Sequence, residues 1–369
     1  MRLQLDHARA LPTSGRLAAA LMIMACGGGG GSDGSSLTPT GPGATGSLNV
    51  VVAGLPGNRV PSITVAGPNS YSSTLAAAGT LSGLAPGSYT ITPGPVADVG
   101  LTYVTAPVTA TVTANATASA SVSYALAVLP RATANRTDES ALPKYHVMYV
   151  LPSDGIDRSL DTDGTLARSI SSWERWYTTQ TGGKYLRLDT SNGAVDITFA
   201  RIPRSDATMT SYGDFLRDTL EKDLRAAGYT STPNTLYLVY YDGGHATRCA
   251  SAAWPPALPG VVAGIYLKGL ASSSVPCATN PFAATPSASP GYIEFVAAHE
   301  VLHLQGIVSP GAPNFSNQHV GNDPTDLMYA GSQVWRPATL DVTKTNYYNA
   351  GGLPAGIVNL ATSAYLAGP

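Results

Sequence analysis

Charge is scarce in this chain of 369 residues: charged side chains make up 12% of it, and the formal net charge is −2. No run of Lys or Arg stands out, so the sequence offers no basic patch for the phosphate backbone of a nucleic acid. Apolar residues, at 44%, are numerous enough to fill a core and argue against a disordered chain. A surface built mainly from Ser, Thr, Asn and Gly is typical of exported proteins.

Long apolar runs and nucleotide motifs are also missing. After the first 30 residues no span of about 20 apolar residues occurs, so no internal membrane helix is expected. Neither a glycine-rich phosphate loop nor a G-x-S-x-G elbow follows an expected strand. The sequence therefore favours neither a nucleotide-binding protein nor a serine hydrolase.

Residues 1–26 are expected to be a signal peptide rather than part of the fold. Three arginines accompany the short apolar run "LAAALMIMA", as in bacterial export signals. The run ends in "IMAC", which resembles the lipobox of bacterial lipoproteins. The resemblance implies that Cys26 carries a lipid and anchors the mature chain to the cell envelope, at the outer membrane if the host is Gram-negative. The alternative is ordinary signal cleavage nearby, which would release a secreted protein and leave Cys26 incidental.

Only two cysteines follow Cys26, namely Cys249 and Cys277. In an exported chain, such a pair is most simply a disulfide that closes one loop. A zinc site built on cysteine is a weaker interpretation because no close C-x-x-C pair is present.

The chain is expected to contain more than one domain. Residues 27–46 are a glycine- and serine-rich linker. Residues 47–127 alternate Val and Ile with small polar residues in short runs separated by turn signals, which predicts an all-β sandwich. Within them, "LSGLAPGSYTITPGPV" resembles the prealbumin-like or carboxypeptidase-regulatory-like modules of surface proteins, and the sandwich is expected to be immunoglobulin-like or prealbumin-like. Residues 128–144 are polar and are expected to be a second linker.

Residues 145–369 mix expected strands with expected helices, which predicts an α/β or α+β domain. "YHVMYVL" (145–151) has the composition of a buried strand. The segment that contains Leu216, Leu220 and Leu224 has an apolar stripe at helical spacing. Ser289 and Pro290 are expected to begin a further helix, as cap and first-turn residue.

That further helix contains the motif "HEVLH". His299 and His303 are four residues apart, so both imidazoles project from one helix face and can reach a single zinc ion. Glu300 lies one position around the helix, where it can take a proton from a water molecule at the metal without being a ligand. The plain alternative is two surface histidines. With six histidines in the chain, a chance motif of this kind is uncommon, so we expect one catalytic zinc.

A catalytic zinc requires a third protein ligand. No glutamate follows Glu300, which excludes enzymes that take a glutamate from a later helix. The motif resembles that of the metzincins, H-E-x-x-H-x-x-G-x-x-H, with Gly306 in place but Ser309 at the third histidine. The only later histidine is His319, so we expect the insertion "SPGAPNFSNQ" to move the third ligand there. Alternative oxygen ligands are Asp323 and Asp326.

The "DLMY" sequence extends this resemblance to secreted bacterial metzincin-like zinc metallopeptidases, over about residues 145–365. The resemblance implies that Met328 forms the methionine turn below the metal. It also suggests that Tyr329 stabilises the oxyanion, although a packing role is an equal alternative. His245 is a further candidate for substrate binding, and its alternative is a solvated loop histidine.

Together these features predict a zinc endopeptidase that hydrolyses protein or peptide substrates and has a lipid anchor at Cys26. One rival is a surface-anchored binding or adhesion protein with a structural or vestigial zinc. Another is a zinc hydrolase that acts on a different bond, because the same activated water can attack any carbonyl.

Overall fold

The computed structural model describes residues 43–57, 59–137, 139–269, 277, 282 and 289–368. Residues 44–369 form one compact unit. The expected signal peptide and Cys26 lie outside the described residues. In the described part of the chain, no helix combines the length and apolar character needed to cross a membrane.

The first part of the chain forms short strands, as the alternating pattern predicts. The strands are β1 (Gly46–Ala53), β2 (Ile63–Gly67), β3 (Tyr71–Leu75), β4 (Gly79–Leu84), β5 (Gly87–Pro93), β6 (Val96–Asp98), β7 (Leu101–Val104), β8 (Val108–Val112), β9 (Thr117–Ser123) and β10 (Ala125–Leu126). They make sheets in the orders β4-β1-β9, β3-β2-β5-β8 and β10-β7-β6. Alternate residues such as Leu48 in β1 and Ile91 in β5 are fully buried in one core.

A five-stranded sheet forms the centre of the second part of the chain. Its order is β15 (Ile197–Arg201), β11 (Lys144–Leu151), β16 (Thr235–Tyr241), β18 (Leu258–Tyr266) and β17 (Ala250–Trp254). The first four strands are parallel, and β17 is an antiparallel edge strand. Every residue of β11 and β16 is buried, because helices cover both faces of this sheet.

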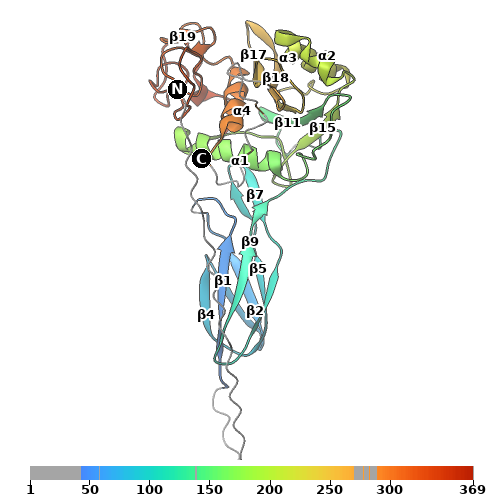
Figure 1. Ribbon diagram of the computed structural model, residues 1–369. Helices are drawn as coiled ribbons and strands as arrows, with labels where there is room; N and C mark the ends of the chain where they lie inside the picture. Colours follow the sequence, from blue (N-terminus) through green and yellow to red (C-terminus); the bar gives the residue numbers. More distant parts are fainter. Residues whose placement is uncertain are drawn as a thin grey trace, which may run out of the picture. The chain divides into compact units, whose positions relative to one another are not determined.

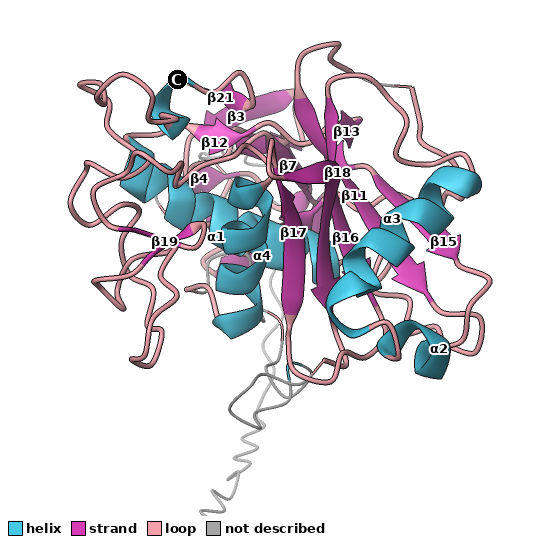
Figure 2. Ribbon diagram, turned by 90° about the horizontal axis from the view of Figure 1, so that it is seen from above, coloured by secondary structure: helices cyan, strands magenta, loops and turns pink. Residues whose placement is uncertain are grey.

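Those helices make the fold three layers deep. One face carries α1 (Thr165–Thr181) and α4 (Tyr292–His303), and the other carries α2 (Asp206–Thr210) and α3 (Leu216–Ala226) (Figure 2). The two helices of the first face also contact each other (Figure 1). The predicted leucine stripe of α3 is fully buried. The fold is therefore a mixed, sheet-rich one with few helices.

The remaining elements are short. They are β12 (Tyr185–Leu186), β13 (Thr190–Ser191), β14 (Ala194–Val195), β19 (Phe315–Ser316), β20 (His319–Val320), β21 (Leu366–Ala367) and the 3₁₀ turns Gly213–Phe215 and Leu360–Thr362.

The expected start of helix α4 at Ser289 and Pro290 is wrong by two residues. The helix begins at Tyr292 after Gly291, whose N–H donates to the Glu294 carboxylate at 3.0 Å. The Glu294 side chain, in the first turn, thus accepts a hydrogen bond from the N–H that precedes the helix, and no Ser cap is needed.

Candidate metal centre

The rings of His299, His303 and His319 converge on one another. His303 Nε2 lies 3.0 Å from His299 Nε2 and 3.1 Å from His319 Nε2. Two of these rings come from adjacent turns of α4, and the third comes from β20. Among the described residues, they form a group of three whose nitrogens lie close enough to hold one metal ion.

Hydrogen bonds to backbone carbonyls set the orientation of two of these rings. His299 Nδ1 donates to the Leu327 carbonyl at 2.7 Å, and His319 Nδ1 donates to the Asn317 carbonyl at 2.7 Å. A carbonyl oxygen can only accept, so each Nδ1 carries the hydrogen, and each neutral ring keeps a lone pair on Nε2. Both lone pairs point toward His303 Nε2, an arrangement that is unfavourable unless a cation or proton lies between them.

Burial disfavours the charged form of each of these rings. Burial, together with His319, lowers the pKa of His299 to about 3. Burial also lowers the pKa of His303 and that of His319. Three neutral imidazoles with converging lone pairs are a donor set that fits zinc well. Nδ1 of His303 is buried without a hydrogen-bond partner among the described residues, so no hydrogen bond at Nδ1 orients this third ring.

Two turns bring His319 back to helix α4. Gly306 has φ +67°, and a Cβ at this position would lie 2.6 Å from the Pro255 carbonyl oxygen. Glycine is therefore required where the chain leaves the helix. Ser309, at the position of the usual third histidine, instead accepts a hydrogen bond from the N–H of Val358 at 3.0 Å.

The second turn is a two-residue β-hairpin. β19 and β20 pair antiparallel, with Ser316 opposite His319. The loop residues Asn317 and Gln318 have φ values of 48° and 74°, as in the type I′ turn that matches strand twist. The inserted segment thus forms a compact hairpin that presents His319 to the other two rings.

The two aspartates that were alternatives to His319 make other contacts. Asp323 accepts hydrogen bonds from the N–H and the hydroxyl of Thr325. Asp326 is fully buried and accepts from Met328 N–H, Val342 N–H and Tyr347 O–H at 2.8–2.9 Å.

Met328 lies in the loop that supports His299. Its side chain is fully buried, and its neighbour Leu327 provides the carbonyl that accepts from His299. Met328 is therefore adjacent in sequence to the residue that orients His299, and its role as a methionine turn below a metal stays a prediction.

A cleft of about 580 Å³ opens beside the histidines. Glu300 faces it and, among the described residues, has neither a hydrogen-bond partner nor an ion-pair partner. Burial raises the pKa of Glu300 to about 8, and Arg248 opposes the increase. The lining comprises residues 247–250, 292, 296, 299, 300, 319 and 329–335.

Tyr329 is one of the residues that line this cleft. Its hydroxyl accepts the N–H of Gln333 at 2.9 Å, which leaves the hydroxyl hydrogen for another acceptor.

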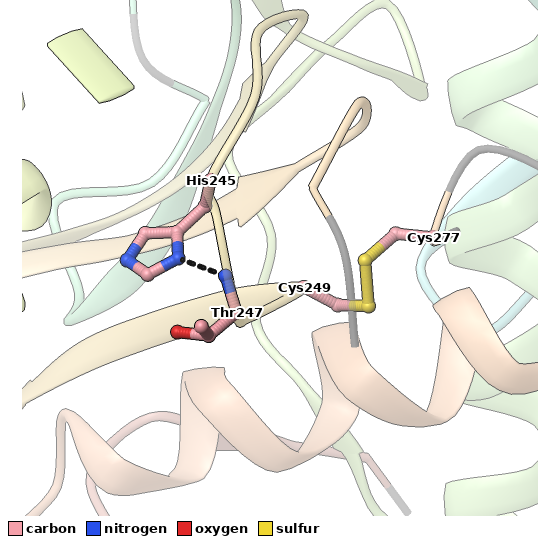
Figure 3. Close-up of a disulfide and its surroundings, with 4 residues drawn as sticks. All are labelled: His245, Thr247, Cys249 and Cys277. Carbon is pink, nitrogen blue, oxygen red and sulfur yellow. Dashed lines mark hydrogen bonds between the residues drawn. A yellow bond between two sulfur atoms is a disulfide. The ribbon is translucent and has the colours of Figure 1, made fainter. Parts of the chain in front are cut away.

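His245 is not a solvated loop histidine, because its side chain is 3% exposed. Its Nε2 donates to the Gly213 carbonyl at 3.1 Å, and its Nδ1 accepts the N–H of Thr247 at 3.1 Å (Figure 3). The ring stacks on Tyr266 with centroids 5.1 Å apart. His245 does not line the cleft; it fixes the loop that does.

The predicted disulfide between Cys249 and Cys277 is present (Figure 3). Cys249 lines the cleft, so the bond anchors the loop next to Arg248.

His146, Asp189 and Asp196 form a second group that the sequence did not reveal. Both nitrogens of His146 are engaged at 2.9 Å, Nδ1 with Asp189 and Nε2 with the Thr198 hydroxyl. Asp196 pairs with Arg136. Because these partners occupy the ligand atoms, the group is a buried structural network.

No family model and no curated protein matches the chain. Solved structures of OgpA from Akkermansia muciniphila are similar at low identity. One wild-type crystal form has 14% identity and a TM-score of 0.32, over 59% of this chain and 63% of that one. A second wild-type form has 13% identity and a TM-score of 0.29, over 47% and 51%. A catalytically inactive OgpA in complex with an O-glycopeptide substrate has 12% identity and a TM-score of 0.27, also over 47% and 51%. The chain thus spans between half and two thirds of OgpA, and the functional assignment depends on the site itself.

Proposed function

We propose that this protein is a zinc-dependent endopeptidase that cleaves protein or peptide substrates. The observation that carries the proposal is the convergence of three imidazole nitrogens beside an unpartnered glutamate in an open cleft. His299, His303 and His319 would hold the zinc. A structural zinc would be enclosed by a fourth protein ligand, whereas the described histidine group has three members.

When bound, zinc supplies a Lewis acid that polarises a carbonyl and makes a nearby water molecule more acidic. Glu300 would take the proton from that water and later transfer it to the leaving amine. Its raised pKa suits this exchange, because a base near neutrality can both accept and release a proton. Tyr329 would donate its free hydroxyl hydrogen to the oxyanion that develops on the substrate.

The edge strand β17 supports a peptide as the substrate. Among the described residues it pairs with β18 on one side only, and its first residue, Ala250, lines the cleft. An unpaired strand edge can bind an extended peptide through main-chain hydrogen bonds. A peptide bound in this way would cross the cleft next to Glu300 and the histidines.

The test compares wild type with Glu300→Gln on an unfolded protein substrate. Gln keeps the shape of the side chain and cannot accept the proton. We expect about one zinc per chain in both proteins by metal analysis, and a loss of cleavage of at least 100-fold in the variant. Equal cleavage by both proteins would reject the role of Glu300. The anchoring of the mature chain to a bacterial envelope through Cys26 is a separate proposal, to be tested by metabolic lipid labelling of wild type and Cys26→Ser.

A further inference from the structure

Arg248 lines the same cleft as Glu300 and is the only lysine or arginine among the described residues that line it. The Arg248 side chain is 46% exposed. With a divalent cation at the histidines, the cleft would carry a net positive charge whether Glu300 is ionised or protonated. A cleft of this kind favours an anionic group on its ligand.

The backbone of Arg248 is fixed on both sides. Before it, the N–H of Thr247 donates to the buried ring of His245 at 3.1 Å. After it, Cys249 is joined to Cys277 (Figure 3). The Cys249 carbonyl also accepts the N–H of Tyr266 at 2.7 Å. The guanidinium is thus carried by a rigid loop. Because the backbone of Arg248 is already held in place, less conformational freedom is lost when its side chain binds a ligand.

The existing partner of the guanidinium is weakly held. Arg248 pairs with Asp214 at 2.9 Å, but the Asp214 side chain is 70% exposed. Exposed pairs contribute little to the stability of a fold, so a ligand can replace Asp214 at low cost. The planar fork of arginine donors matches a carboxylate, to which it can make two parallel hydrogen bonds.

We propose that Arg248 binds a carboxylate of the substrate, so that the cleft selects peptides with an acidic group near the cleaved bond. This inference rests on the proposed peptidase function. The carboxylate comes either from an Asp or Glu side chain or from a free peptide C-terminus, since both present the same chemistry to a guanidinium.

Binding can be measured without cleavage in the zinc-loaded full chain with Glu300→Gln. The probes are fluorescein-labelled octapeptide pools that carry Glu at one fixed position, with matched pools that carry Gln there, and all C-termini are amidated. We expect the Glu pool to bind about tenfold more tightly than its Gln partner at one or two positions, and the ratio to shrink in high salt.

Variants of Arg248 separate a direct contact from a structural effect. With Arg248→Gln the Kd ratio between the pools should fall to about one. With Arg248→Glu the preference should change to pools that carry Lys at the same position, which a merely structural residue would not cause. The matched control, Asp214→Asn, removes the surface partner and should keep the preference for Glu.

A second set of pools with free C-termini shows whether the bound carboxylate belongs to a side chain or to the C-terminus of the peptide. A preference for fixed Glu in amidated pools identifies a side-chain carboxylate, and tight binding only of free-acid pools identifies the terminal carboxylate. The inference would be overturned by a Kd ratio near one for every Glu/Gln pair together with equal binding of amidated and free-acid pools, or by a preference that persists in Arg248→Gln. Failure of the proposed function is a different result, in which wild type with Glu300 intact cleaves no unfolded protein.

Discussion

His299 Nδ1 donates a hydrogen bond of 2.7 Å to the carbonyl of Leu327, a residue 28 positions later in the chain. The bond joins the helix that carries two histidines to the loop that contains Met328. It fixes the tautomer of His299 and the direction of its Nε2 lone pair. The orientation of one expected ligand therefore depends on the backbone of a distant loop.

The shape of that loop is expected to control the affinity for zinc. Asp326 holds the loop by accepting from three donors, so Asp326→Asn should weaken it while keeping the side-chain volume. We expect zinc affinity to fall about 10- to 100-fold, measured by competition with a chelator. Ile63→Ala in β2 is the control, because it should destabilise the fold by about 2–5 kcal/mol without changing that affinity. A similar affinity in Asp326→Asn and wild type would argue against the support role.

The identity of the third ligand can be tested by substitution. His319→Ala should reduce the zinc content from about one to near zero per chain after dialysis, because two imidazoles bind zinc weakly. Asp323→Asn should retain it, since the Asp323 carboxylate is engaged by Thr325. The reverse pattern would assign the metal to Asp323. Elemental analysis of the purified full chain decides between them.

His245 should make stability depend on pH on the acid side. Burial, with a smaller contribution from Arg248, lowers its pKa, and the Gly213 carbonyl and Asp214 act in the opposite direction. The unfolded chain then binds a proton below about pH 6.5 that the folded chain does not. Stability should fall as the pH decreases from 6.5, by at most about 1.4 kcal/mol per pH unit. His245→Phe keeps a ring against Tyr266 and should show a smaller slope in urea titrations at pH 5–7.5. Identical slopes would exclude His245 as the source.

Glu174 should make the folded chain less stable as the pH rises. Its side chain is fully buried, one carboxyl oxygen accepts the N–H of Leu186 at 3.0 Å, and the other has no partner among the described residues. Burial raises its pKa well above the usual value.

The folded chain therefore keeps a proton on Glu174 that the unfolded chain releases above about pH 4.3. Stability should fall as the pH rises from there toward the folded pKa. Glu174→Gln should flatten this part of the curve in urea titrations between pH 4.5 and 8, and the exposed Glu139→Gln should not. Parallel curves for wild type and Glu174→Gln would contradict the assignment.

Local patterns in the sequence predict the features that depend on near neighbours. The spacing of His299 and His303 follows from the helix period alone, and the buried strand β11 is visible as the mostly apolar run "YHVMYVL". The disulfide follows from a count of cysteines in an exported chain. The position of His319 beside the other two rings follows from elimination, but the hairpin that brings it there was not anticipated, since Asn317-Gln318 lacks the glycine usual in such turns.

Features that depend on distant partners were missed or mispredicted. His245 is buried because Tyr266, on another strand, covers its ring, and no local pattern in "YYDGGHATRC" indicates this contact. The pairing of His146 with Asp189 and Thr198 likewise needs three separate segments to meet. The start of α4 was misplaced because Glu294 satisfies the N-terminus from within the helix.

The β-strand region and the histidine-bearing region also share a buried charge. Asp98, 4% exposed at the end of β6, pairs with Arg59 and with Arg175 of α1, and the Tyr103 hydroxyl is 3.0 Å from Ser171 Oγ of the same helix. A fragment cut at residue 145 would lose Asp98 and Tyr103 and leave Arg175 without its acidic partner. Recombinant work on the histidine-bearing part alone would consequently start from a protein in which Arg175 and Ser171 of α1 lack their partners, and the two parts are better produced as one piece.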